Sequence, residues 1–206
     1  MFFVRILKQY PMPDRNQYDI QNIDLTGDYY KIKQSLIRNK YKLTDKNDDV
    51  VLKGKQKMFK MKEEFPFVNG SGDEAFTVRA GGILDVAGTY TLFDSVTEQP
   101  VVVLDEDLTL FVENWKIRDP STEEVLATIK SKNKVLSALR HLSDLANIAP
   151  NKYEIFDASG KKIGEIAGEL SIKDTYKVTI DRESNVPREA VIASACVLDA
   201  LENKSS

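Results

Sequence analysis

One short pattern recurs along the chain and limits its fold more than any other feature. It consists of an aromatic residue, any residue, an aliphatic residue, any residue and then Asp. The aromatic and aliphatic positions are two apart, so they would share one face of a β-strand. The Asp would end the strand, because its side chain bonds nearby backbone N–H groups and favours a turn. The pattern occupies 41–45, 90–94, 115–119 and 153–157, and with one extra residue 176–181.

Turn-forming residues and then a second apolar run follow the copies, as Val50–Leu52 follows the first and Val101–Leu104 the second. This order is typical of β-hairpins. The copies start 49, 25, 38 and 23 residues apart. Unequal spacing argues against a solenoid or propeller and favours a sandwich or barrel of about ten to twelve strands. Other strand-like segments are 30–37, 59–62, 74–79 and 173–181.

Two segments instead have the spacing of helices. Residues 135–148 place Leu and Ala at three- and four-residue spacing, and Pro150 would stop that helix. Residues 190–201 are apolar nearly all round, with Asn185 expected as the cap, Pro187 in the first turn and Glu189 beside the positive end of the helix dipole. A helix without a polar face must be surrounded by other elements.

The C-terminal helix has many small side chains, so it would fit a confined space. A barrel of about twelve strands leaves a lumen that needs filling. We therefore predict a mainly β fold, a closed ~12-stranded antiparallel β-barrel enclosing the C-terminal hydrophobic helix, with one extra helix near 135–148. A sandwich with the helix on one open face is the alternative. A membrane hairpin is a third, although the apolar run is too short for a span.

The hairpin motifs, the opening segment Tyr30-Lys31-Ile32-Lys33-Gln34 and the apolar helix 191–200 together resemble the LURP-one-related family. That family lies within the tubby C-terminal-like superfamily, which also includes phospholipid scramblases. The resemblance covers about residues 28–202 and implies a twelve-stranded barrel around a central helix. Tubby-like relatives bind phosphoinositides and scramblases have a proposed calcium site, but we carry none of their binding residues over to positions in this chain.

The sequence departs from the simplest family pattern at 63–89, a glycine-rich stretch that resembles an insertion, and at 133–151, which contains the extra helix. We expect three parts: residues 1–27 as an N-terminal strand and lead-in segment, 28–202 as the barrel, and 203–206 as a disordered tail. The first residues read better as a strand than as a secretory signal, because Arg5 and Lys8 interrupt the apolar run.

The single Cys and single His exclude much chemistry. No intrachain disulfide can form, and a Cys/His zinc site would lack ligands. A nucleophilic mechanism would need His141 or Cys196, which we expect on a helix surface and in the core respectively. The acidic run 105–107 lacks the spacing of an EF-hand, and the glycine-rich stretch matches no nucleotide-binding motif. We therefore expect no metal and no cofactor, whereas a pair of carboxylates acting as a hydrolase stays open.

Charge is unevenly distributed behind the net value of −3. Residues 31–62 contain eleven Lys or Arg against three Asp, a net charge of +8, and residues 94–124 have a net charge of −7. Alternating lysines would put a basic face on one strand, which could attract anionic lipid. The alternative is a solvated face that prevents pairing between strand edges. The candidate lipid- or anion-binding residues are Lys53, Lys55, Lys57, Lys60 and Lys62.

The sequence thus favours a non-enzymatic binding or adaptor module that engages anionic, phosphoinositide-like phospholipid surfaces. The alternatives are a hydrolase with a carboxylate pair in a cleft at one barrel end, and a protein-interaction domain without a small ligand. We expect a cytoplasmic monomer whose partners are an anionic membrane surface or another protein. Nucleic acid is not expected, because the net charge is negative and a stacking platform is missing from the sequence.

Overall fold

The computed structural model describes residues 18–35, 40–55, 57–58, 63–81, 88–109, 112–132, 152–169 and 175–202. Within them the fold is mainly β, as predicted, with one antiparallel sheet and one long helix, α2 (Arg188–Glu202). The strands are β1 (Tyr29–Ser35), β2 (Lys40–Thr44), β3 (Val50–Lys55), β4 (Lys57–Met58), β5 (Glu63–Asn69), β6 (Glu74–Ala80), β7 (Thr89–Asp94), β8 (Pro100–Thr109), β9 (Val112–Arg118), β10 (Val125–Ser131), β11 (Lys152–Asp157), β12 (Lys162–Gly168) and β13 (Thr175–Ile180).

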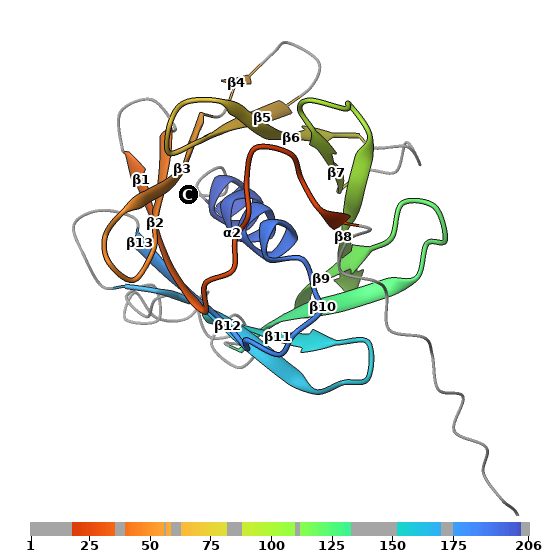
Figure 1. Cartoon of the computed structure of the whole chain (residues 1–206). Coiled ribbons are helices and arrows are strands. Elements are labelled where there is room, and N and C mark those ends of the chain that lie inside the picture. Colours follow the sequence, from red (N-terminus) through yellow and green to blue (C-terminus); the bar gives the residue numbers. More distant parts are fainter. Residues whose placement is uncertain are drawn as a thin grey trace, which may run out of the picture.

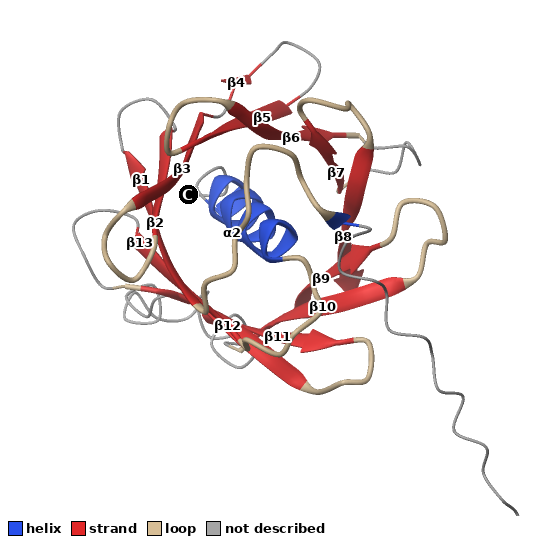
Figure 2. Cartoon of the chain, viewed as in Figure 1, coloured by secondary structure: helices blue, strands red, loops and turns tan. Residues whose placement is uncertain are grey.

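The sheet closes into a barrel. Strands β5 to β13 pair in chain order, β13 pairs with β1, and β1 leads through β2 to β3. β3 then pairs with β5, with Lys53 opposite Val68, which completes a ring of twelve strands. The two-residue strand β4 pairs with β5 beside this junction. Figure 2 shows the ring of strands around the helix.

Gly54 makes this closure sterically feasible. Gly54 lies opposite Phe67 across the β3–β5 junction. A Cβ atom at position 54 would lie 2.4 Å from a ring carbon of Phe67, a distance that only glycine avoids. The Phe67 ring therefore packs over the glycine backbone, where it also stacks on Phe76.

The helix α2 runs through the centre of the ring (Figure 1). Every residue from Ala190 to Leu198 is at most 4% exposed, which confirms the enclosed helix. α2 begins at Arg188, three residues after Asn185. Asn185 therefore does not flank the helix, and the expected cap is wrong by position. Glu189 lies in the first turn, as predicted, whereas Pro187 directly precedes that turn and was expected within it.

The residues of the strand motif occupy the expected positions. The aromatic side chains of four copies face the core and are buried: Tyr41, Tyr90, Trp115 and Tyr153. The Asp at the end of every copy accepts hydrogen bonds from backbone amides two to four residues later, which fixes the turn. These Asp residues are Asp45, Asp94, Asp119, Asp157 and Asp181.

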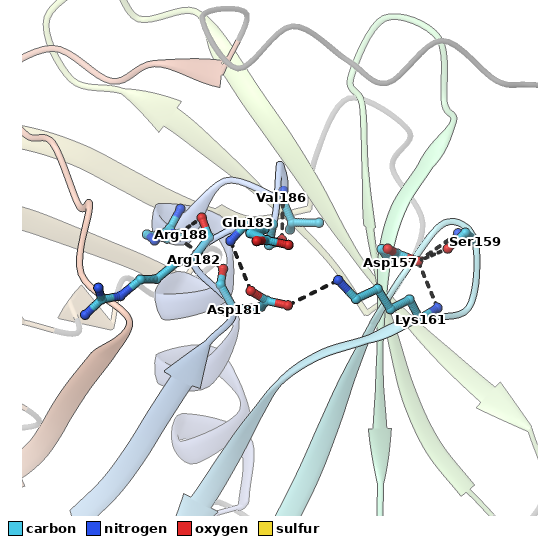
Figure 3. A network of polar contacts seen from close by, with 9 residues as sticks. Asp157, Ser159, Lys161, Asp181, Arg182, Glu183, Val186 and Arg188 are labelled. Atoms are coloured by element: carbon cyan, nitrogen blue, oxygen red, sulfur yellow. Dashed lines mark hydrogen bonds and ion pairs between the residues drawn. The ribbon is translucent and has the colours of Figure 1, made fainter.

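Two of these turns also contact each other. Lys161, in the turn after Asp157, forms an ion pair with Asp181 at 3.2 Å (Figure 3). Beyond Asp181, the Arg188 guanidinium donates to the carbonyls of Asp181 and Arg182, both at 3.3 Å. The start of α2 is thereby attached to the same end of the barrel as the Asp turns.

Residues 18–28, which we call the strap, cross the opening of the barrel at this end, in front of α2 (red in Figure 1). Tyr18, Ile20 and Leu25 of the strap are buried and belong to the hydrophobic core. The Gln21 amide donates to Asp94 Oδ2 at 2.7 Å, and the Leu25 amide donates to Glu189 Oε1 at 3.0 Å. The strap therefore covers the apolar core beside the start of α2.

The expectation that 63–89 is an insertion is wrong for residues 63–80, because they form the barrel strands β5 and β6. β5 follows the repeated motif in altered form: Phe65 and Phe67 face the core and Asn69 replaces Asp. Asn69 Oδ1 accepts from the amides of Gly72 and Asp73, as the aspartates do in their turns. The segment does not match the motif as defined, because Phe67 replaces the aliphatic residue and Asn69 replaces Asp.

Several predictions fall outside the described residues: the N-terminal strand, the helix near 135–148, His141 and the tail 203–206. Among the described helices, none has the length and apolarity required to cross a bilayer.

Candidate anion-binding face

A row of lysines crosses the outer surface of β1, β2 and β3. Lys33 lies opposite Lys42, and Lys42 lies opposite Lys53. All three are exposed. The row follows from the alternation of a strand, because successive side chains point to opposite faces. The inward-facing positions next to it are apolar and buried: Ile32, Leu43 and Leu52.

Two more described lysines extend the row along the strands. Lys31 precedes Lys33 by two residues on β1, and Lys40 precedes Lys42 by two residues on β2. Lys40 is exposed and Lys31 is half-buried. We call the set Lys31, Lys33, Lys40, Lys42 and Lys53 the lysine face.

The lysine face differs from other lysines of the barrel in its ion pairing. On β11 and β12, Lys162 lies 2.7 Å from Glu154 and 3.3 Å from Glu165. Lys132, just after β10, pairs with Glu154, and Lys152 pairs with Glu165. Among the described residues, the lysine face makes no ion pair. Its one hydrogen bond with a described partner runs from Lys53 Nζ to the carbonyl of Gly70, at 3.1 Å.

The carboxylates respond to these surroundings. The pKa of Glu154 is lowered by Lys162 and then by Lys132. The pKa of Glu169 is lowered first by its ion pair with Lys177, and the charges of Lys31 and Lys33 lower it further. Glu169 therefore lies close enough to the lysine face for the positive charge of that face to lower its pKa.

Protection of a strand edge does not explain this face. β3 pairs with β2 on one side and with β5 on the other, and Lys53 lies inside both ladders. A closed barrel has no edge there for lysines to protect. Like charges directly opposite each other also destabilise a sheet. Lys33, Lys42 and Lys53 therefore impose a cost on folding that a solvated surface does not require.

The structure distributes the five predicted lysines unequally. Lys53 belongs to the lysine face, and Lys55 lies opposite Lys40 in the register of β3 and β2. Lys57 lies on β4 opposite Glu64, away from that row. Lys60 and Lys62 are outside the described residues. Sequence reasoning missed Lys31, Lys33, Lys40 and Lys42, although each pair shows the same alternation that identified Lys53 and Lys55.

The other sequence candidates have structural roles or gain no support. Asp105, from the acidic run 105–107, accepts from Arg118 Nε at 2.5 Å and from the Thr89 hydroxyl at 3.4 Å. Within the described part of the chain no group of three or more His, Cys, Asp or Glu is placed to hold a metal ion. Cys196 is 2% exposed, which agrees with its expected place in the core.

Two cavities flank the strap at the barrel end, where a carboxylate-based hydrolase would have its cleft. They measure about 480 and 380 Å³. Asp28 in the larger one pairs with Arg182 at 2.6 Å, which lowers the pKa of that carboxyl. Glu189 in the smaller one accepts from the Leu25 amide, and burial raises its pKa. Asp28 and Glu189 thus hold the adjacent turn and the strap in place, and Asp24 also lines both cavities.

Comparisons with known proteins agree with this architecture. The family model described as LURP-one-related matches residues 50–199. An X-ray structure of an Arabidopsis thaliana protein superposes with a TM-score of 0.55 at 13% sequence identity, covering 93% of this chain and 98% of the other. That likeness is one of fold alone. Among curated proteins, none matches this chain in sequence.

Proposed function

From the premise that this chain belongs to the LURP-one-related family, we propose that it is a binding module that engages anionic phospholipid surfaces through the lysine face. The observation that carries the proposal is the row Lys33–Lys42–Lys53, in which directly opposed lysines lack carboxylate partners among the described residues.

An anionic membrane would supply the missing counter-charge. Each lysine near such a surface contributes about 1 kcal/mol of binding free energy. The three lysines of the row would contribute about 3 kcal/mol, which is about a hundredfold in affinity. Because the cytoplasmic leaflet carries the anionic lipids, the proposal places the protein at that leaflet.

The packing of β1, β2 and β3 on the core supports the idea that the lysine face is a rigid platform for contact with a membrane. The strands that carry the lysine face are held by the core through Ile32, Leu43 and Leu52, which are at most 3% exposed. Their positions are therefore set before a ligand arrives. A preformed array loses less conformational entropy on binding than lysines on a flexible segment.

Co-sedimentation with vesicles tests the proposal. We expect binding to phosphatidylcholine vesicles that contain phosphatidylserine or a phosphoinositide, and little binding to phosphatidylcholine alone. Binding should disappear at about 1 M salt, where the screening length falls to about 3 Å. Equal, negligible binding to anionic and neutral vesicles at low salt would contradict the proposal.

A matched pair of variants tests the role of the lysine face. The first replaces Lys33, Lys42 and Lys53 by Gln, and the control replaces Lys132, Lys152 and Lys162 by Gln. Both remove three positive charges, but the control lysines are ion-paired with glutamates. We expect about a hundredfold weaker binding for the first variant and a much smaller change for the control. Equal losses would show that net charge, and not the lysine face, governs binding.

A further inference from the structure

The turn between β5 and β6 contains the single Asn-Gly step of the sequence, Asn69-Gly70. Asn-Gly steps are the most prone to deamidation, because glycine has no side chain to hinder attack by its own backbone nitrogen. Gly70 is also required by the fold. A Cβ atom there would lie 2.3 Å from the carbonyl oxygen of Val50, so no other residue fits without a backbone shift.

The Asn69 side chain is a latch between this turn and the strap. Its Nδ2 donates to the carbonyl of Asn22 at 3.0 Å and to Asp73 Oδ2 at 3.1 Å. Its Oδ1 accepts from the amides of Gly72 and Asp73 at 2.9 and 3.0 Å. These four contacts use both donors and both lone pairs of the amide. They also fix its orientation, because backbone amides must face the oxygen and a carbonyl must face the nitrogen.

Asn22 completes the attachment from the strap side. Its Nδ2 donates to the carbonyl of Glu74 at 3.0 Å, while its own carbonyl accepts from Asn69. The middle of the strap is thus joined to the β5–β6 turn by two side-chain amides. Both hydrogen bonds are exposed to water, so hydrolysis of an amide at this place has its co-reactant at hand.

We propose that Asn69 is a deamidation site and that its conversion to Asp opens the latch. The Gly70 nitrogen attacks Cγ of Asn69 to form a succinimide, and the side-chain nitrogen leaves as ammonia with the displaced proton. Water then opens the ring to Asp or isoaspartate. The new carboxylate can still accept from the Gly72 and Asp73 amides, but it has no hydrogen to donate to Asn22 or Asp73.

Deamidation also replaces the contact between the Asn69 amide and the Asp73 carboxylate by a contact between two carboxylates. Asp73 Oδ2 lies 3.1 Å from the Asn69 nitrogen, so a negative charge at position 69 would face it at close range. The carbonyl of Asn22 would face the same charge. Attraction therefore becomes repulsion on both sides, so the middle of the strap loosens and the adjacent hydrogen bond from the Gln21 amide to Asp94 opens more often.

Mass spectrometry of the full-length protein after incubation in mildly alkaline buffer tests the first half of the proposal. Peptides containing Asn69 should gain the mass of amide hydrolysis well before peptides containing Asn22, Asn47 or Asn185. These asparagines serve as internal controls, because each is followed by a residue other than glycine. Deamidation of Asn69 at no greater rate than these three would overturn it.

Hydrogen exchange tests the second half. In Asn69→Asp, the amide of Gln21, which donates to Asp94 beside the latch, should exchange about tenfold faster than in the wild type, whereas those of β11 and β12 should not change. Adding Asp73→Asn should slow exchange again, because an amide at 73 can donate to the new carboxylate. If Asn69→Asp fails to fold, the Asp product of aged wild-type protein, separated from the isoaspartate product, provides the same comparison. Unchanged exchange in the strap of the deamidated form would overturn the latch.

Discussion

The hydroxyl of Tyr18 donates a buried hydrogen bond to Asp119 Oδ2 at 2.8 Å, across 101 residues of sequence. The other oxygen of Asp119 accepts from the Ser121 and Thr122 amides of its own turn. One carboxylate therefore shapes a hairpin and also fixes the first described residue of the strap. Burial raises the pKa of Tyr18 and Asp119 raises it further, so the hydroxyl keeps its proton even in alkaline solution where a free tyrosine would lose it.

Tyr18→Phe should lower the free energy of unfolding by about 1.5–3 kcal/mol, because it removes a buried hydrogen bond to a charged oxygen of Asp119. Asp119 is 3% exposed, so water cannot readily replace the hydroxyl. Urea unfolding measures the change. Tyr29→Phe is the control, since Tyr29 is only half-buried, and it should stay within about 0.5 kcal/mol of the wild type. Equal effects would contradict a specific role for the Tyr18 hydroxyl.

The free energy of unfolding should decrease in acid because Asp94 and Asp119 become protonated. Burial alone would raise the pKa of each, but backbone amides, and for Asp119 also Tyr18, lower it below the usual value. A group whose folded pKa is lowered stabilises the protein above its unfolded pKa of about 3.9, and this contribution is lost as pH falls through the folded value. Chemical unfolding between neutral pH and pH 2 should show the decline, and Asp94→Asn should reduce its steepness.

Glu189 should have the opposite effect, lowering the free energy of unfolding as the pH rises. Burial raises its pKa, and Asp24 adds to the rise. Its contribution is present below its unfolded pKa of about 4.3 and is lost as pH rises through the folded value. Glu189→Gln keeps an oxygen for the Leu25 amide and removes this loss. Its stability relative to wild type should therefore improve between pH 4 and pH 7. A pH-independent difference would contradict the assignment.

Ala195→Arg should prevent folding, because it buries an unpaired charge on the enclosed helix. Ala195 is 1% exposed in the middle of α2. Thr179→Arg is the control, since Thr179 is exposed on β13, and it should give soluble, folded protein. Circular dichroism and soluble yield distinguish the two. A soluble Ala195→Arg protein of normal stability would show that α2 is not enclosed.

Gly54→Ala should destabilise the barrel at its closure by about 1–3 kcal/mol, the usual effect of overpacking. The added methyl would meet the ring of Phe67. Phe67→Leu in the same chain should restore part of the loss, because it removes the atoms in collision. Thermal unfolding of both variants measures this. Additive losses in the double variant would contradict the steric explanation.

Local pattern was enough to predict the barrel and its enclosed helix. The period of two between Tyr90 and Leu92 determines which side chains face inward, and the apolar circumference of α2 requires enclosure. The strap was not predicted, because its attachments join residues far apart in the chain. Asp94 looks like any turn residue in the sequence, and its bond to Gln21 exists only after folding.

The candidate site was predicted in part for the same reason. Alternation identified Lys53 and Lys55 on one strand, but a row across three strands depends on register. Lys33, Lys42 and Lys53 are 9 and 11 residues apart in the sequence, and pairing of β1, β2 and β3 brings them together. Within the described residues, the lysine face has no carboxylate partners. Alternation along a single strand cannot predict this, because it depends on which strands become neighbours in the folded barrel.

A fluorescent label at single sites tests the lysine face most directly. Cys196 is buried, so Lys42→Cys and Lys162→Cys each provide one accessible thiol on folded protein. With vesicles containing phosphatidylserine, a label introduced through Lys42→Cys should become shielded from a quencher dissolved in water, and one introduced through Lys162→Cys should not. Shielding only at the Lys162 position, or equally at both, would contradict the proposal that the lysine face contacts the membrane.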